Sequence, residues 1–329
     1  MCAAGGAASE PSSSRPGSVA ELGEFGLITR VTAGRGLPPT TLLGPGDDAA
    51  VLATADGRVV ATTDLLVEGV HFRLDWSTPH QVGRKAVAAN LADVAAMGAV
   101  PTALVVGLAM PGTTPVSTVD ELAAGMWEEA GKAGAGIVGG DMVSSTELVV
   151  SVTALGDLQG RAPVTRSGAR AGDALGLCGR VGWAAAGLAA LARGFRSPPA
   201  VVDAHRVPEP PYRAGPQAAL AGATAMIDVS DGLLADAAHL AEASGVGIDI
   251  DSAAVPVPSL LIEVASALGA DARHWTLTGG EDHALLASFP AGVALPTGWA
   301  ALGTVRSGRG VTVDGRTYEG PGGWDHFAP

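Results

Sequence analysis

A series of carboxylates lies at the ends of expected strands and helices, among small or apolar neighbours. Asp is common in turns and helix caps, so each residue taken alone also has a local structural interpretation. The members of this series are Asp47, Asp48, Asp64, Asp93, Asp141, Asp228, Asp231, Glu281 and Asp282. Together they offer many carboxylate oxygens, which are natural ligands for Mg²⁺.

Asp93 is the acid that a local role explains least. It lies in the interior of a helix expected over 78–98, where Thr78 would cap the first turn and Pro79 would occupy the first helical position. Its own face carries Ala86, Asn90 and Met97. A carboxylate in such surroundings is costly unless hydrogen bonds or a cation compensate its charge. We therefore expect Asp93 to bind a cation.

An acidic site can serve phosphate groups only through bound cations. Two unit charges about 4 Å apart repel by roughly 4 kcal/mol at an effective dielectric near 20, and each added carboxylate worsens this. Mg²⁺ binds carboxylates, retains water and bridges phosphate oxygens, so the acid set predicts several magnesium ions. The competing explanation, a calcium loop, requires a D-x-D-x-D-G pattern that the sequence lacks.

Two common nucleotide-binding motifs are excluded. A Walker loop requires Gly-Lys followed by Ser or Thr, whereas the only such pair, Gly131-Lys132, is followed by Ala133. Segment 44–49 formally fits G-x-G-x-x-A, but that fingerprint must lie between a strand and a helix. Here a β-hairpin is expected over 49–65, with its turn at Asp56-Gly57, and two carboxylates would face the anion.

Composition excludes several further classes of protein. The net charge is −13 and Lys85 and Lys132 are the only lysines, so a nucleic-acid partner is not expected. Cys2 and Cys178 cannot form a disulfide framework. The sequence shows neither a signal peptide nor an apolar run long enough to span a membrane, so a cytoplasmic protein is expected.

The hydrophobic patterns alternate between helices and strands, which predicts an α/β architecture. Helices are expected near 21–31, over 78–98, from a Thr118–Glu121 capping box to the glycine-rich segment 131–140, over 182–194, and from 231 to 245. Strands are expected at 101–110, 148–156, 173–179, 225–229, 247–251, 284–289 and 301–305. Residues 1–19 are small, polar and Pro-containing, which predicts a disordered tail. Length and the turn-rich segment 161–173 predict two domains, 20–158 and 159–329.

The motifs, taken in order, resemble the thiamine-monophosphate kinase family from Gly23 to Phe327. They are GEFGLI, GPGDDAAVL, ATTDLLVEGVHF, KAVAANLADVAAMGA, GGDMVSS, TRSGARAGD, IDVSDGLLADAAHL, TGGEDH and GWDHF. The resemblance implies an aminoimidazole ribonucleotide synthetase-like fold of mixed α/β (α+β) type. Its N-terminal domain would bind ATP and Mg²⁺ and pair with a second copy across a β-barrel, and a C-terminal α/β domain would follow. It also implies a homodimer that transfers the γ-phosphate of ATP to thiamine monophosphate.

The resemblance also implies a role for each matching residue. The implied magnesium ligands are Asp48, Thr62, Thr63, Asp64, Asp93, Asp141, Asp228 and Asp231. The implied ATP contacts are Gly140, Asp141, Arg166 and Ser230, and the implied contacts to thiamine monophosphate are His71, Glu281 and Trp324. Three positions differ from the usual family pattern, namely Pro45, Thr62 in place of Ser, and His283 in place of Tyr.

Simple structural roles remain open for four of these residues. Arg166 offers a fork of donors for phosphate but could be a solvated surface residue. Ser230 could meet an anion at a helix start or merely cap that helix. Trp324 could stack on a cationic thiazolium or anchor the chain end. His71, next to Phe72, could hold a phosphate or serve the fold.

The implied acceptor is itself an anionic phosphate, so direct in-line transfer needs no general base and no phosphoenzyme. Two alternatives remain. The chain could be another ATP-using enzyme of the same superfamily, although GWDHF argues against aminoimidazole ribonucleotide synthetase. Selenophosphate synthetase would need a reactive Cys near a glycine-rich loop, whereas Cys2 lies in the expected tail. From another class, the chain could be a non-catalytic magnesium–nucleotide sensor.

Overall fold

The computed structural model describes residues 17–45, 49–318 and 322–323. Most of the expected tail, residues 1–16, therefore lies outside the described residues. Ser18 already belongs to the fold, because its side chain accepts a hydrogen bond from the Glu21 N–H and caps helix α1 (Val19–Leu22). Within the described ranges, no helix is both long and apolar enough to cross a membrane.

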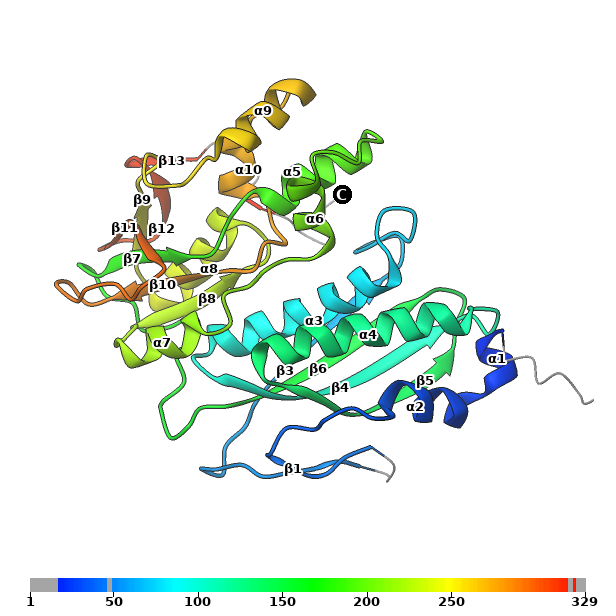
Figure 1. The fold of residues 1–329 in the computed structure, drawn as a ribbon. Helices are drawn as coiled ribbons and strands as arrows, with labels where there is room; N and C mark the ends of the chain where they lie inside the picture. Colours follow the sequence, from blue (N-terminus) through cyan, green and yellow to red (C-terminus); the bar gives the residue numbers. More distant parts are fainter. Residues whose placement is uncertain (1–16, 46–48, 319–321, 324–329) are drawn as a thin grey trace, which may run out of the picture.

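The first half of the chain forms a four-stranded sheet in the order β3-β6-β4-β5. β4 and β5 are parallel and joined by α4, whereas β6 is antiparallel to both β3 and β4. α3 and α4 lie side by side over one face of this sheet (Figure 1). The elements are β3 (Val60–Val67), α3 (Pro79–Ala96), β4 (Val100–Met110), α4 (Val116–Ala133), β5 (Gly136–Ser144) and β6 (Val149–Asp157).

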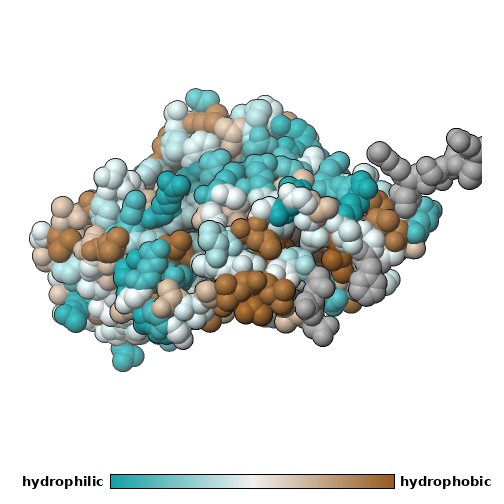
Figure 2. Space-filling view, turned by 60° about the horizontal axis from the view of Figure 1, so that its bottom comes forward, coloured by the Kyte–Doolittle hydropathy of each residue, from teal (hydrophilic) through white to brown (hydrophobic). Residues whose placement is uncertain are grey.

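Strand alternation gives this sheet two different faces. The closed face, under α3 and α4, carries Thr62 and Asp64 of β3, and Thr62 is hydrogen-bonded to α3. The register of the four strands places the side chains of the opposite, open face together. These include Thr63, Leu65, Val105, Asp141 and Val143. Leu65, Val105 and Val143 are 53%, 38% and 55% exposed, and apolar side chains gather on this underside of the molecule (Figure 2).

The second half forms a seven-stranded sheet in the order β13-β12-β9-β11-β7-β10-β8. Its strands are β7 (Ala174–Cys178), β8 (Ala225–Val229), β9 (Gly247–Ile250), β10 (Ala284–Phe289), β11 (Trp299–Arg306), β12 (Gly310–Val313) and β13 (Arg316–Thr317). Its helices are α5 (Trp183–Ala192), α6 (Pro199–Arg206), α7 (Ala214–Leu220), α8 (Leu233–Ser244), α9 (Ser259–Leu268) and α10 (Ala272–Thr278). The reduced, buried Cys178 lies in β7.

α3 lies between the two halves of the molecule. Thr78 and Gln81 form a capping box at its start, and most of its residues are buried. Ala95 and Ala96, near its end, share a hydrophobic core with Met226 and Phe289 of the second sheet. Small side chains let other elements approach α3 closely, since a Cβ on Gly215 of α7 would lie 1.9 Å from the Ala95 carbonyl oxygen. Polar residues of α3 can therefore meet groups from both halves.

Most expected elements are confirmed, including α3, β4, β6, α5, α8 and the strands β7 to β11. Near the N-terminus, Gly23 at φ 74° divides the single expected helix into α1 and α2 (Glu24–Thr32). The Thr118–Glu121 capping box is wrong, because α4 begins at Val116 behind Pro115 and has no side-chain cap.

The expected hairpin over 49–65 is also wrong. β2 (Val51–Leu52) pairs with β1 (Thr41–Leu43), whereas β3 pairs with β6 along its whole length. The turn near Asp56 exists, but it is stabilised by local contacts. The Asp56 carboxylate accepts hydrogen bonds from the backbone and guanidinium of Arg58. A local turn signal therefore did not determine which strands pair.

β5 lies partly within the glycine-rich segment 131–140, for which no strand was expected. Gly134, in the left-handed conformation, ends α4 as expected. The following glycines belong to a strand because β4 approaches them closely. A Cβ on Gly140 would lie 2.1 Å from the Val106 carbonyl oxygen. Glycine here permits sheet packing rather than a turn.

Candidate active site

Three acids from three elements form a common site, which we call the acid cluster: Asp64 of β3, Asp93 of α3 and Asp228 of β8. Thr62 Oγ1 donates to Asp93 Oδ2 over 2.8 Å. Burial, followed by the charges of Asp228 and Asp64, raises the pKa of Asp93 to about 7. Burial also raises the pKa of Asp64. The cluster therefore gathers negative charge that these protein groups compensate only in part, as a cation site does.

His283 is paired with one acid of this cluster. Its Nδ1 lies 3.0 Å from Asp228 Oδ2, and its backbone N–H donates to the Val229 carbonyl. Burial disfavours the charged ring, but the hydrogen bond and charge of Asp228 outweigh it, and with the nearby acids they raise the pKa of His283 to about 9. Sequence reasoning noted His283 only as a departure from Tyr. Its position two residues after Glu281 was the available signal.

The loop containing Glu281 packs directly on the turn between β8 and α8. The Glu281 N–H donates to the Ser230 carbonyl over 2.7 Å, and a Cβ on Gly280 would lie 2.2 Å from that same oxygen. Glu281 itself has a positive φ of 68°. Because these backbone segments are in direct contact, the positions of Ser230 and Glu281 relative to each other are constrained.

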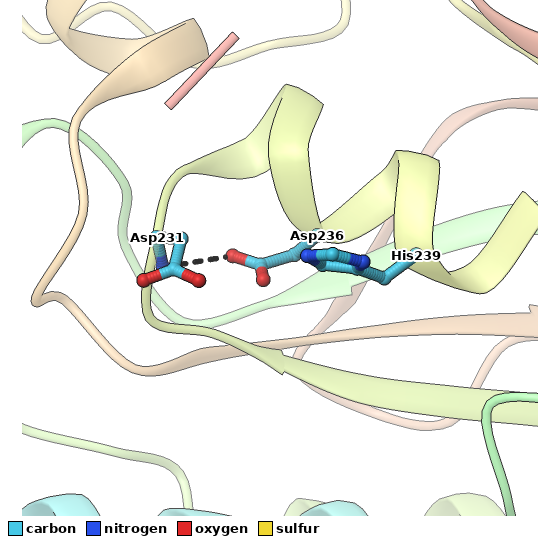
Figure 3. A group of neighbouring side chains, drawn as sticks. All are labelled: Asp231, Asp236 and His239. Carbon is cyan, nitrogen blue, oxygen red and sulfur yellow. Dashed lines mark hydrogen bonds between the residues drawn. The ribbon is translucent and has the colours of Figure 1, made fainter. Parts of the chain in front are cut away.

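Asp231 belongs to a second group of potential metal ligands, with Asp236 and His239 of α8 (Figure 3). One ligand atom from each lies within 4.8 Å of the others. Asp236 accepts hydrogen bonds from the backbone N–H groups of Asp231 and Gly232. Burial, then the charges of Asp228 and Asp231, raises the pKa of Asp236 to about 7. Sequence reasoning missed Asp236 and His239, although both face Asp231 from the first turns of the helix.

The two described residues implied to contact thiamine monophosphate meet at Lys85. Lys85 Nζ forms an ion pair with Glu281 Oε2 and donates to the His71 carbonyl oxygen over 3.1 Å. His71 Nδ1 accepts a hydrogen bond from the Val67 N–H. Desolvation favours the neutral acid, but the charge and hydrogen bond of Lys85 outweigh it and lower the pKa of Glu281 to about 2. Sequence reasoning missed Lys85, a lysine among alanines and valines of α3.

Other expected site residues lie elsewhere. Thr63 is on the open face, where its Oγ1 donates to the Val152 carbonyl. Gly140 and Asp141 lie on β5, at the opposite edge of the sheet from β3, and Asp141 is exposed on the open face. Arg166 is exposed between β6 and β7, where its carbonyl accepts a hydrogen bond from Ser244 Oγ. Asp48 and Trp324 lie outside the described residues.

Asp282 has a structural role. Its two carboxylate oxygens accept hydrogen bonds from the N–H groups of Trp183 and Ala184 over 2.9 and 3.0 Å. It therefore holds the start of α5, and burial raises its pKa to about 7 despite these bonds. For Asp282, the local structural role that is open to every Asp in the series is therefore correct.

Comparisons with known proteins agree with this architecture. Residues 46–158 match the AIR synthase related protein, N-terminal domain, and residues 170–294 match the corresponding C-terminal domain. The chain is 55% identical over 309 residues to the thiamine-monophosphate kinase of Mycobacterium tuberculosis, which covers 93% of this chain and 92% of that protein. It is 45% identical over 329 residues to that of Corynebacterium glutamicum, covering 96% and 97%.

Among solved structures, AaThiL complexed with AMPPCP and TMP is similar to this chain with a TM-score of 0.78 at 33% identity. The match covers 93% of this chain and 98% of that one. The mixed α/β fold, with the two AIR synthase related domains in this order, is therefore confirmed for this chain.

Proposed function

This chain belongs to the thiamine-monophosphate kinase family, among the AIR synthase related proteins, and on that premise we propose that it transfers the γ-phosphate of ATP to thiamine monophosphate, forming thiamine diphosphate. The structural observation that carries the proposal is the acid cluster of Asp64, Asp93 and Asp228. It gathers negative charge from both halves of the molecule at one place, which suits cation-mediated binding of phosphates.

The chemistry of this cluster fits magnesium. Its donors are carboxylate oxygens with the Thr62 hydroxyl beside them, and hard oxygen ligands are those Mg²⁺ prefers. Bound there with both substrates, several Mg²⁺ ions would neutralise phosphate charge and polarise the transferred phosphoryl group. The residues proposed to hold them are Asp48, Thr62, Thr63, Asp64, Asp93, Asp141, Asp228 and Asp231.

The protein groups have the tasks of binding and orientation. Gly140, Asp141, Arg166 and Ser230 are proposed to contact ATP, and His71, Glu281 and Trp324 are proposed to contact thiamine monophosphate. The acceptor phosphate is already anionic near neutral pH, since phosphomonoesters have a second pKa near 6. We therefore propose direct in-line transfer, in which the enzyme aligns two anions and no side chain becomes phosphorylated.

We also propose a homodimer that forms through the open face. The exposed Leu65, Val105 and Val143 would be covered by a second copy, and Thr63 and Asp141 lie among them. Residues 20–158 would then bind ATP and Mg²⁺ and dimerise, and residues 159–329 would form the second domain. An enzyme that consumes ATP is expected to work in the cytoplasm.

The test combines purified protein, ATP, Mg²⁺ and thiamine monophosphate, with thiamine diphosphate measured as the product. Thiamine serves as the control acceptor, and no phosphorylated thiamine is expected from it. ATP binding without turnover would favour the alternative of a nucleotide sensor. A phosphorylated protein trapped with γ-labelled ATP during turnover would contradict direct transfer.

A further inference from the structure

Lys85 is a buried cation that holds both halves of the molecule together beside the proposed acceptor site. Only 4% of it is exposed, and it projects from α3. Its ammonium group contacts the Glu281 carboxylate in the loop between α10 and β10. It also donates to the backbone of His71, in the connection between β3 and α3. A single charged group therefore connects the two described residues that are proposed to bind the acceptor.

Glu281 is constrained from two directions. Its backbone is fixed by the short hydrogen bond to Ser230 and by the close approach of Gly280. Its carboxylate is fixed by Lys85, while 40% of the side chain remains exposed. The side chain is thus anchored through Oε2 and remains partly exposed to a ligand. An accessible anion of this kind suits the cationic, N–H-bearing organic part of thiamine monophosphate rather than its phosphate.

Lys85 itself is poorly placed to contact ATP phosphates. A buried ammonium group requires partners, and the Glu281 carboxylate and the His71 carbonyl both engage it. We propose that Lys85 is a positioning residue for the acceptor substrate: it fixes the Glu281 carboxylate and the His71 connection in the arrangement that receives thiamine monophosphate. The proposal rests on the proposed function and on the assigned contacts of Glu281 and His71.

The experiment compares Lys85→Met, which keeps most of the side-chain length without the charge, with the wild-type enzyme. Lys85→Met is expected to raise KM for thiamine monophosphate about ten- to thirtyfold, because removing one partner of a desolvated charge pair is costly even after some solvent screening. KM for ATP is expected to change less than about twofold, since the groups that Lys85 contacts, the Glu281 carboxylate and the His71 carbonyl, belong to proposed acceptor contacts. Lys85→Arg, which keeps the charge, is expected to fall between the two enzymes.

Lys132 provides the matched control. It is the other lysine of the chain, and its Nζ lies 2.9 Å from the buried carboxylate of Glu129 on α4. Lys132→Met is expected to leave both KM values unchanged. Thermal unfolding of each variant separates a loss of folded protein from a loss of acceptor binding.

A double-mutant cycle tests whether Lys85 acts through Glu281. In a Glu281→Gln background, Lys85→Met is expected to raise KM for thiamine monophosphate by less than about threefold further, because the carboxylate it positions is gone. Independent, multiplicative effects would overturn the proposal. An unchanged KM for thiamine monophosphate, with only the unfolding temperature lowered, would also overturn it and leave Lys85 as a link between the two halves of the molecule.

If Lys85→Met does not fold, Lys85→Arg and Glu281→Gln carry the test through the same KM comparison, and an unchanged acceptor KM in Lys85→Arg would then count against positioning. Failure of the wild-type enzyme to make thiamine diphosphate would instead overturn the proposed function.

Discussion

The acids on the two faces of the N-terminal sheet lie in different surroundings. On the closed face, Asp64 is grouped with Asp93 and Asp228, and His283 approaches from the other half of the chain. On the open face, Asp141 is exposed among apolar side chains. The acids of the closed face therefore interact with other charged groups of the same chain. For the acid of the open face, we propose that a substrate, a cation or a second copy would complete its surroundings.

The two faces differ because, in the described part of the chain, a helix covers one of them and not the other. The closed face is built by α3, whose small residues let it fit between two sheets and carry Lys85, Asn90 and Asp93 into the region where they meet. Asn90 accepts a hydrogen bond from the Asp64 N–H and donates to the Ala86 carbonyl, which ties the edge strand to the helix. No comparable helix covers the open face within the described residues (Figure 1). In the proposed homodimer, a site that uses both faces would be completed by assembly.

The largest expected effect comes from removing one charge on each face. Asp93→Asn and Asp141→Asn are each expected to lower kcat at least about 10³-fold, because a lost metal ligand removes several kcal/mol of transition-state stabilisation. Product formation at saturating substrates measures the loss, and circular dichroism checks folding. Asp120→Asn, which removes the partner of Arg30 on the surface, is the control. Near-normal turnover in Asp141→Asn would restrict the chemistry to the closed face.

The second prediction tests whether the open face binds another copy. Leu65→Glu is expected to weaken dimerisation at least about 100-fold, because each copy would bury an unpaired charge. Ile262→Glu is the matched control, since both side chains are 53% exposed but Ile262 lies on α9 in the other half. Sedimentation over a range of protein concentrations measures the association. A Leu65→Glu protein that remains dimeric would place the interface elsewhere.

Much of this arrangement could be predicted from the sequence. The Thr78-Pro79 start, the apolar runs of β4 and β6, and the costly position of Asp93 each rest on local rules that the fold obeys. The alternation of β3 could even have separated Thr63 from Thr62 and Asp64, because successive side chains point to opposite faces of a strand. The implied ligand set, which placed Thr62, Thr63 and Asp64 together, overlooked this constraint.

The remainder depends on contacts between residues that are distant in sequence. The pairing of β3 with β6 spans about 90 positions and prevails over the local turn at Asp56. Lys85 and Glu281 are separated by 196 positions, and neither residue's neighbours in sequence indicate the other. Propensity and spacing describe single segments, so they identify a buried charge but not its partner.

The smallest expected effect is on stability, and it concerns the closed face alone. Burial raises the pKa of Asp93 to about 7 in the folded metal-free protein, whereas an unfolded Asp titrates near pH 4. Below about pH 4 the carboxyl is neutral in both states and carries no cost. Between about pH 4 and 7 the unfolded chain ionises first, so this group lowers the free energy of unfolding as the pH rises.

Asp93→Asn removes this dependence. In EDTA, the variant is expected to match the wild type near pH 4 and to exceed its free energy of unfolding by about 2 kcal/mol at pH 8, as measured by urea denaturation. Asp141→Asn, an exposed change on the open face, is expected to differ by less than about 0.5 kcal/mol at either pH. Parallel curves for Asp93→Asn and the wild type would mean that protein groups such as His283 already neutralise the acid cluster. The closed face would then not require a cation, and the two faces would differ only in exposure.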